Sequence, residues 1–338
     1  MIDFRSDTFT KPTPGMLEYM FNAEVGDDVF GEDPSIKKLE SLIAEMFGME
    51  ASIFCPSGTM TNQIAIKCHT QPGDEVICEE MSHVYIYEGG GIAFNSGAQV
   101  KAIKGDRGRI EAEQVLEAVN SNDAHKARTR LVSLENTTNR GGGSCYEFND
   151  IQLIKEVCLE KNLRLHLDGA RLFNALIAKH EVPKKYGEIF DSISICLSKG
   201  LGAPVGSLLL GNKELITQAK RIRKVFGGGM RQGGYLAAAG IYALEHNIDR
   251  IATDHLHAKQ IAEALLKKEF IGKMLPVETN IIIAEVIETY TPQSLADTLK
   301  KFSILVMTIS KTQIRLVVHL DITEDMVKES IKVIQEMV

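Results

Sequence analysis

The stretch SISICLSKGLGAPVGSLLLG, residues 192–211, decides the fold of this chain. An apolar, β-prone run ends at Ser-Lys-Gly, and a second apolar run, SLLLG, follows closely. A lysine buried at the mouth of a sheet costs free energy unless its charge is removed or paired. Lys199 therefore indicates chemistry at a strand end, and the early return of SLLLG predicts one antiparallel strand.

Strand and helix patterns alternate on both sides of this stretch, which predicts an α/β fold with a mostly parallel sheet covered on both faces. Strands are expected at 51–55, 75–79, 130–136, 164–168, 192–198 and 206–211, and helices at 35–48, 58–69, 111–119, 149–162, 213–225 and 232–270. From about residue 271 the regular alternation of strand and helix patterns ends, and two strands and two helices predict a small α+β unit. We expect a large domain over 1–250, including an extended N-terminal segment, and a small domain over 251–338.

Composition excludes several classes of partner. The net charge of −7 leaves no basic footprint for nucleic acid or an anionic membrane. No apolar run reaches the roughly 20 residues that span a bilayer, and the N-terminus lacks the apolar core of a signal peptide. The six cysteines are scattered without a Cys-x-x-Cys pair, which is typical of reduced thiols in a cytoplasmic protein.

Two ionisable residues of opposite charge end consecutive predicted strands. Asp168 closes RLHLD, and Lys199 lies 31 residues later, after the next strand. Alone, Asp168 before Gly-Ala is better explained as a helix N-cap. Together, however, the pair lies at the sheet edge where α/β proteins bind ligands. A lysine for a Schiff base and an aspartate for a pyridinium nitrogen are what pyridoxal 5′-phosphate (PLP) requires.

Other motifs are weaker and are weighed with that pair. PSGTMTNQ (56–63) offers a helix N-terminus with Ser57, Gly58 and Thr59 for a phosphate, although it also fits an ordinary capping motif. His83 follows a strand at the same edge and could stack on a planar cofactor, and Arg231 in GGGMRQGG could reach an anion. GLGAPVG leads into a strand, which excludes a dinucleotide loop. No metal site is predicted, because His255 and His257 do not share a helix face.

Eight motifs in order resemble the low-specificity L-threonine aldolases, PLP enzymes of the aspartate aminotransferase fold (fold type I), over nearly the whole chain. They are RSDTFT (5–10), EVGDDVFGEDPS (24–35), PSGTM (56–60), SLENTTNRGG (133–142), HLDGARLFNA (166–175), LSKGLGAPVGS (197–207), GGGMRQ (227–232) and IRLVVH (314–319). The resemblance implies retro-aldol cleavage of L-threonine or L-allo-threonine to glycine and acetaldehyde, in a homotetramer built as a dimer of dimers.

The resemblance also implies a role for each matching residue. Lys199 would carry the Schiff base, Asp168 would pair with the pyridine nitrogen, Arg171 would lie near the ring hydroxyl, and His83 would stack on the ring. Ser57, Gly58 and Thr59 would hold the phosphate, with Arg231 from a neighbouring subunit. Ser6 and Arg315 would bind the substrate carboxylate, and Phe30 and Tyr87 would come from the second subunit. His125 matches a family histidine implicated at the substrate hydroxyl.

Several alternatives stay open. The base at the β-hydroxyl could be His83, His125 or a water molecule. The family often has Tyr at Phe30 and His at Thr138, so the preference between threonine and allo-threonine is undetermined. Another PLP-dependent β-eliminating lyase of the same fold is the second candidate, and a PLP-holding protein without turnover is the third.

Overall fold

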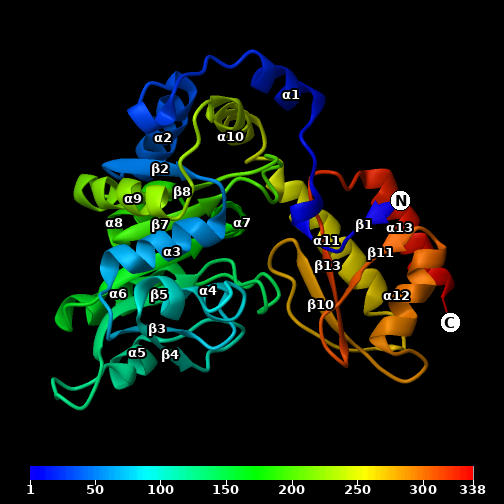
Figure 1. Cartoon of the computed structure of the whole chain (residues 1–338). Helices are drawn as coiled ribbons and strands as arrows, with labels where there is room; N and C mark the ends of the chain where they lie inside the picture. The colour runs from blue at the N-terminus through cyan, green and yellow to red at the C-terminus, as the bar shows by residue number, and fades with distance from the viewer. Residues whose placement is uncertain (338) are drawn as a thin grey trace.

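The computed structural model describes residues 1–337 and is built around a seven-stranded sheet in the order β2-β8-β7-β6-β5-β3-β4 (Figure 1). β8 runs antiparallel to both of its neighbours, β2 and β7, and the other strand pairs of this sheet are parallel, which confirms the interpretation of SLLLG. The strands are β2 (Ala51–Cys55), β3 (Asp74–Glu79), β4 (Gln99–Ile103), β5 (Arg128–Glu135), β6 (Arg164–Gly169), β7 (Ser192–Cys196) and β8 (Ser207–Gly211).

Helices cover both faces of this sheet, as the alternating pattern predicts. Leu209 of β8 packs with α3 (Gly58–His69) and α9 (Lys213–Val225), whereas Leu208 and Leu210 face the larger core on the other side. That larger core is completed by α2 (Pro34–Phe47), α5 (Ala112–Ala118), α6 (Phe148–Glu160), α7 (Leu172–Lys179) and α10 (Gly234–His246). The mostly parallel sheet with helices on both faces has the predicted α/β architecture.

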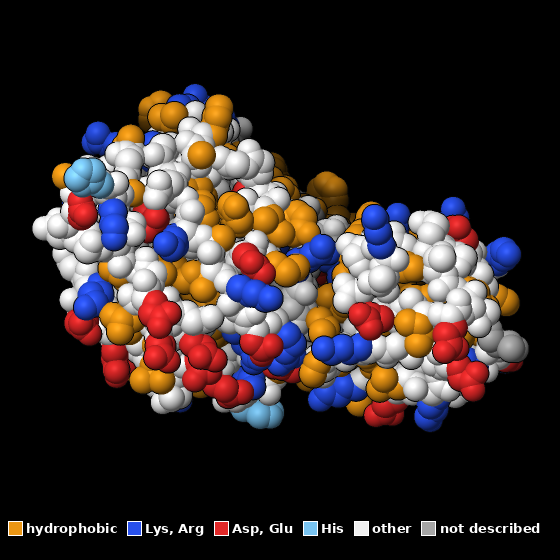
Figure 2. All heavy atoms as spheres, turned by 90° about the horizontal axis from the view of Figure 1, so that it is seen from below, with side chains coloured by type: hydrophobic (Ala, Val, Ile, Leu, Met, Phe, Trp, Pro, Cys, Tyr) orange, Lys and Arg blue, Asp and Glu red, His pale blue; other side chains and the backbone are white. Residues whose placement is uncertain are grey.

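A second hydrophobic core defines the small unit, which forms the other lobe of the molecule (Figure 2). Its four-stranded antiparallel sheet has the order β12-β13-β10-β9, and β1 (Ile2–Asp3) pairs with β11 (Ile304–Leu305). Ile2 and Phe4 belong to this core, so the N-terminal residues join the small unit. The remaining elements are β9 (Ile271–Met274), β10 (Ile281–Val286), β12 (Met307–Thr308), β13 (Gln313–Val317), α11 (Ile251–Leu265), α12 (Pro292–Lys301) and α13 (Glu324–Glu336).

The structure differs from the sequence expectations at several elements. The helical pattern over 232–270 is broken, because α10 ends before Asn247, whose Nδ2 donates to Leu201 O at 2.8 Å. The N-terminal segment contains α1 (Pro14–Phe21), which Thr13 caps in front of a proline at the first helical position. No helix within residues 1–337 is long and apolar enough to cross a membrane, and all six cysteines are free.

Candidate active site

The carboxyl ends of β5, β6 and β7 meet at one edge of the large sheet. Glu135 ends β5 and lies beside Asp168 of β6 in the parallel register, and Lys199 lies three residues after the end of β7. The N-terminal segment reaches this edge too, since Thr10 Oγ1 donates to Lys199 O at 2.9 Å. The structure therefore brings Asp168 and Lys199 to the sheet edge where ligands of this fold class bind.

Asp168 is held by a chain of hydrogen bonds that runs along the sheet interior. Asn62 Nδ2 donates to Asp168 Oδ2 at 3.0 Å, and Asn62 Oδ1 lies 3.1 Å from His166 Nε2. His166 Nδ1 lies 2.8 Å from Ser192 Oγ, which lies 2.8 Å from His69 Nε2. Because an amide oxygen only accepts, His166 donates from Nε2 and, when neutral, accepts at Nδ1. Every link then donates toward Asp168.

The buried histidines of this hydrogen-bond network predict that the protein loses stability in mild acid. Burial lowers the pKa of His166 to about 4 and that of His69 to about 3, from an ordinary 6.5. The unfolded chain therefore binds more protons between pH 6.5 and pH 4, and the free energy of unfolding falls as pH falls through that window. We expect His166 alone to account for about 2 kcal/mol between pH 7.5 and pH 5.

Urea unfolding of the PLP-loaded protein at those two pH values measures the loss. His166→Gln should be less stable at pH 7.5 and show a smaller difference between the two pH values. An unchanged difference would contradict the assignment of a neutral, proton-excluding His166.

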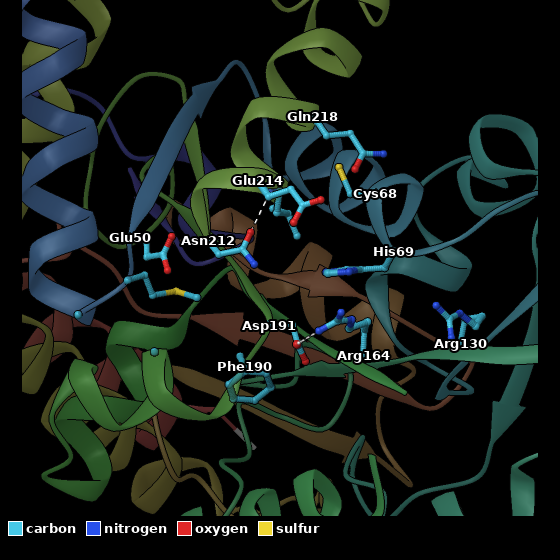
Figure 3. A pocket seen from close by; sticks show the side chains of 15 residues that line it. Glu50, Cys68, His69, Arg130, Arg164, Phe190, Asp191, Asn212, Glu214 and Gln218 are labelled. Carbon is cyan, nitrogen blue, oxygen red and sulfur yellow. Dashed lines mark hydrogen bonds and ion pairs between the residues drawn. The ribbon is translucent and has the colours of Figure 1, made fainter. Parts of the chain in front are cut away.

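The hydrogen-bond network ends at His69, beside a polar cavity at the opposite edge of the sheet. His69 lines this cavity of about 480 Å³ together with Arg130, Arg164 and Asp191 (Figure 3). Arg164 is paired with Asp191 across 2.9 Å. None of the residues that the sequence predicts for the site lines this cavity, whereas Phe30 lines a larger cavity of about 610 Å³.

His83 is oriented by an acidic partner. Its Nδ1 lies 2.9 Å from Glu88 Oε1, and Asn62 and Gln63 donate to the Glu88 carboxylate at 2.9 and 2.7 Å. Burial lowers the pKa of His83, but Glu88 and Asp168 outweigh that effect and raise it. A proton on Nδ1 leaves Nε2 free to accept one, which is the arrangement of a general base.

His83, Glu88 and Asp168 also offer three ligand atoms within 4.8 Å of one another. Asn62 Nδ2 donates to both of these carboxylates. We therefore interpret the group as a hydrogen-bonded network and assign no metal to it.

Glu135 joins two loops around the site. Its carboxylate accepts from the backbone N–H groups of His83 and Asn139, each at 2.8 Å. Burial raises the pKa of this carboxyl to about 7. Thr138, between these contacts, donates to Arg107 O at 2.9 Å and lies 2.8 Å from Ser144 Oγ. Its hydroxyl thus contacts Ser144 of its own loop and the backbone of the turn at Arg107.

The residues predicted to hold a phosphate lie at the N-terminus of α3. Ser57 caps the helix by accepting from Met60 N at 3.2 Å, and both Ser57 and Thr59 are exposed. A Cβ on Gly58 would lie 2.5 Å from Cys196 Sγ, so only glycine lets the backbone pass here. Exposed hydroxyls beside helix N–H groups are the chemistry that binds a phosphate.

Arg171 is part of a buried ion pair that the sequence did not reveal. Its Nε and Nη2 each donate to Asp7 across 2.7 Å, with both side chains almost fully buried. Burial raises the pKa of Asp7, but Arg171 outweighs it and lowers the pKa to about 2. Arg171 Nη1 is outside this pair and remains available to a ligand.

Ser6 and Arg315 come together through the neighbouring backbone. Arg315 Nη2 donates to Arg5 O at 3.1 Å, and its Nη1 donates to Asn139 Oδ1 at 2.8 Å. Burial lowers the pKa of Arg315 to about 10. Ser6 is 7% exposed, and its Oγ accepts from Thr8 Oγ1 at 2.9 Å. Arg315 is therefore hydrogen-bonded to the residue next to Ser6, the other residue predicted to bind the substrate carboxylate.

Four other predicted residues, Tyr87, Phe30, Arg231 and His125, are described within one chain. Tyr87 lies beside His83 of its own chain, with ring centroids 5.7 Å apart. Phe30 is 75% exposed and lies 5.9 Å from the Arg231 guanidinium, which pairs with Asp27. His125 precedes the amino end of β5, on the edge opposite Asp168, with a side chain 94% exposed. Within one chain, the structure does not bring His125 to the site.

The residues at this edge fit PLP by their chemistry. An amine, a buried carboxylate and a hydroxyl-lined helix N-terminus match the aldehyde, ring nitrogen and phosphate of that cofactor. Sequence reasoning missed Asn62, Glu88, Glu135 and Asp7. Asp7 and Glu135 lie inside the quoted motifs RSDTFT and SLENTTNRGG, and Glu88 follows His83 by five positions. Their position within or near the motifs was the available signal. Several of their hydrogen-bond partners, such as Arg171 for Asp7 and His83 for Glu135, lie far away in the sequence.

Comparison with known proteins gives a consistent result. The family model described as beta-eliminating lyase matches residues 3–289. The low specificity L-threonine aldolase of Escherichia coli K12 is 42% identical, covering 97% of each chain, and low-specificity L-threonine aldolase 1 of Arabidopsis thaliana is 40% identical over 99% and 96%. The threonine aldolase structure from Leishmania major has a TM-score of 0.86 at 21% identity, covering 99% of each chain. Sphingomonas wittichii serine palmitoyltransferase reaches 0.78 at 16%, covering 99% and 86%.

Proposed function

This chain belongs to the beta-eliminating lyase family and, within it, to the low-specificity L-threonine aldolases, and on that premise we propose that it cleaves L-threonine and L-allo-threonine to glycine and acetaldehyde. The observation that carries the proposal is the convergence of Lys199, Asp168 and the His83–Glu88 pair at one sheet edge. The reaction breaks the Cα–Cβ bond of a β-hydroxy-α-amino acid, as a carbon–carbon lyase does.

We propose PLP as the cofactor, held by the residues that the motifs predict. Lys199 would bind its aldehyde carbon, Asp168 its ring nitrogen and Arg171 Nη1 its ring hydroxyl, with His83 stacked on the ring. Ser57, Gly58 and Thr59 would bind its phosphate, together with Arg231 of a neighbouring subunit. When bound, this cofactor supplies an acceptor for the electron pair that the broken bond releases.

The chain's own residues perform the remaining work. Ser6 and Arg315 bind the α-carboxylate, because a guanidinium forks onto a carboxylate with two parallel hydrogen bonds. His83 accepts the β-hydroxyl proton at Nε2, since Glu88 accepts the Nδ1 proton and fixes the tautomer. As the proton leaves the oxygen, the aldehyde C=O forms and departs. Lys199 returns a proton to Cα to complete glycine.

We also propose a homotetramer, assembled as a dimer of dimers, that works in the cytoplasm. Phe21, Phe30, Phe94 and Val225 are each at least 75% exposed, and large exposed apolar side chains support contacts with other subunits. In such an assembly, Phe30 would complete a neighbouring site, and His125 could act only on another subunit. The six free cysteines support a reducing compartment.

Product analysis tests the proposed function. The PLP-loaded protein is incubated with L-threonine and, separately, with L-allo-threonine, and glycine and acetaldehyde are quantified. We expect equimolar products, and the ratio of the two rates gives the Cβ preference.

Pyruvate and ammonia from β-chloro-L-alanine, without glycine from either threonine isomer, would instead identify a β-eliminating lyase. Bound PLP with no product from any of the three compounds would contradict an enzymatic role.

A further inference from the structure

Two guanidinium groups near the site have no acidic partner. Within residues 1–337, neither Arg140 nor Arg315 has a carboxylate oxygen within 4.0 Å, and the buried Nε atom of each lacks any hydrogen-bond partner. Arg140 reaches only Ile309 O, at 3.5 Å. Arg315 is buried and Arg140 is half-buried, whereas the other buried arginines within residues 1–337, Arg171 and Arg223, are paired with Asp7 and Asp28. The two unpaired groups therefore need anions that the chain itself does not supply.

The two arginines lie close enough to repel each other. Burial is the main cause of the lowered pKa of Arg315, and the charges of Arg171 and Arg140 lower it further. Arg171 is neutralised by Asp7, so the uncompensated charge at this place comes from Arg140 and Arg315. A single α-carboxylate on Arg315 removes one of these two charges and leaves the other.

Arg140 lies on the side of the site where the substrate side chain would sit. Its Cζ is 5.8 Å from the centroid of the Tyr87 ring, and that ring is 5.7 Å from the imidazole of His83. Glu135 fixes this arrangement by binding the backbone N–H groups of both His83 and Asn139. Arg315, in contrast, faces Asn139 and Arg5 at the proposed α-carboxylate position.

We propose that Arg140 binds a second carboxylate, carried on the substrate side chain, and that the site therefore cleaves β-hydroxy-α-amino diacids. This inference rests on the proposed function, because it concerns the same bond and the same base. With 3-hydroxyaspartate, the Cα–Cβ bond breaks, the hydroxyl proton leaves as the C=O bond of glyoxylate forms, and Cα gains a proton to give glycine. No oxidant, reductant or other co-reactant is required.

The test compares two substrates in one set of variants. The PLP-loaded wild type, Arg140→Met and Arg140→Lys are assayed with L-threonine and with the threo and erythro isomers of L-3-hydroxyaspartate, measuring acetaldehyde or glyoxylate. Arg140→Met should lower kcat/KM for the preferred diacid isomer about 10- to 100-fold and that for threonine less than threefold. Arg140→Lys should restore part of the loss.

A binding measurement separates recognition from chemistry. L-aspartate and L-asparagine have the same shape and differ in side-chain charge, so their inhibition constants against threonine cleavage report the second carboxylate. L-aspartate should bind the wild type more tightly than L-asparagine, and Arg140→Met should remove that difference. Arg130→Met is the matched control, because Arg130 also lacks an ion pair but lies at the opposite edge of the sheet.

Three outcomes overturn the inference. An equal loss for threonine and the diacid in Arg140→Met would assign Arg140 to the α-carboxylate. Cleavage of threonine without cleavage of either diacid isomer would refute the diacid substrate and leave the proposed function standing. Cleavage of neither substrate class would refute the proposed function itself and the inference with it.

Discussion

Replacing Lys199 with alanine is expected to lower acetaldehyde formation from L-threonine at least ~10³-fold, because the amine both holds the cofactor and moves a proton. Lys199 follows β7 at the edge where Asp168 and Glu135 meet. A coupled alcohol dehydrogenase assay measures the rate. Lys213→Ala is the matched control, since Lys213 is an exposed residue at the start of α9 and should leave the rate unchanged.

The role of Lys199 has a second, activity-independent test. Reduction of the PLP-loaded protein with borohydride, followed by peptide mass spectrometry, should place the pyridoxyl group on Lys199. In Lys199→Ala that label should be absent while the melting temperature of the apoprotein stays near that of the wild-type apoprotein. A label on another lysine, or near-normal acetaldehyde release from the variant, would refute the assignment.

Replacing Asp7 with alanine should have the largest effect on stability, about 3–5 kcal/mol of unfolding free energy. The change leaves the Arg171 guanidinium buried without its partner, after it has lost two hydrogen bonds of 2.7 Å. Urea unfolding at a fixed protein concentration and saturating PLP measures the loss. Arg171→Met in the same chain should recover much of it, because the uncompensated buried charge is then gone.

Asp3→Ala provides the matched control in the same N-terminal segment. Asp3 also pairs with an arginine, but the Arg5 and Asp3 side chains are 38% and 23% exposed, so we expect a loss below about 1 kcal/mol. Equal losses for the Asp7 and Asp3 variants would contradict the importance of burial. The pKa of Asp7 is lowered to about 2, so its contribution is present above its ordinary value of 3.8 and is lost as pH falls toward 2.

Local patterns predicted most of the large sheet. The strand at 51–55 and the helices at 58–69 and 213–225 have the predicted bounds, because apolar periodicity and capping residues act over a few neighbouring positions. The short β4 and helix α1 were missed. None of the five residues of β4 is fully buried, so its sequence QVKAI shows only a weak alternation of apolar and polar residues. The break near Asn247 depends on a contact with Leu201, which lies far away in the sequence.

The sequence by itself determined the fold class, the family, and the Lys199–Asp168 pair, because these depend on residue type at the ends of strands. Only the tertiary structure decided how those residues are supported. Three contacts join segments that are far apart in the sequence. Asn62 donates to Glu88 and Asp168, Arg171 pairs with Asp7, and Arg140 lies beside Tyr87. Long-range hydrogen bonds and ion pairs have no local periodicity, so a single sequence carries no signal of which groups meet.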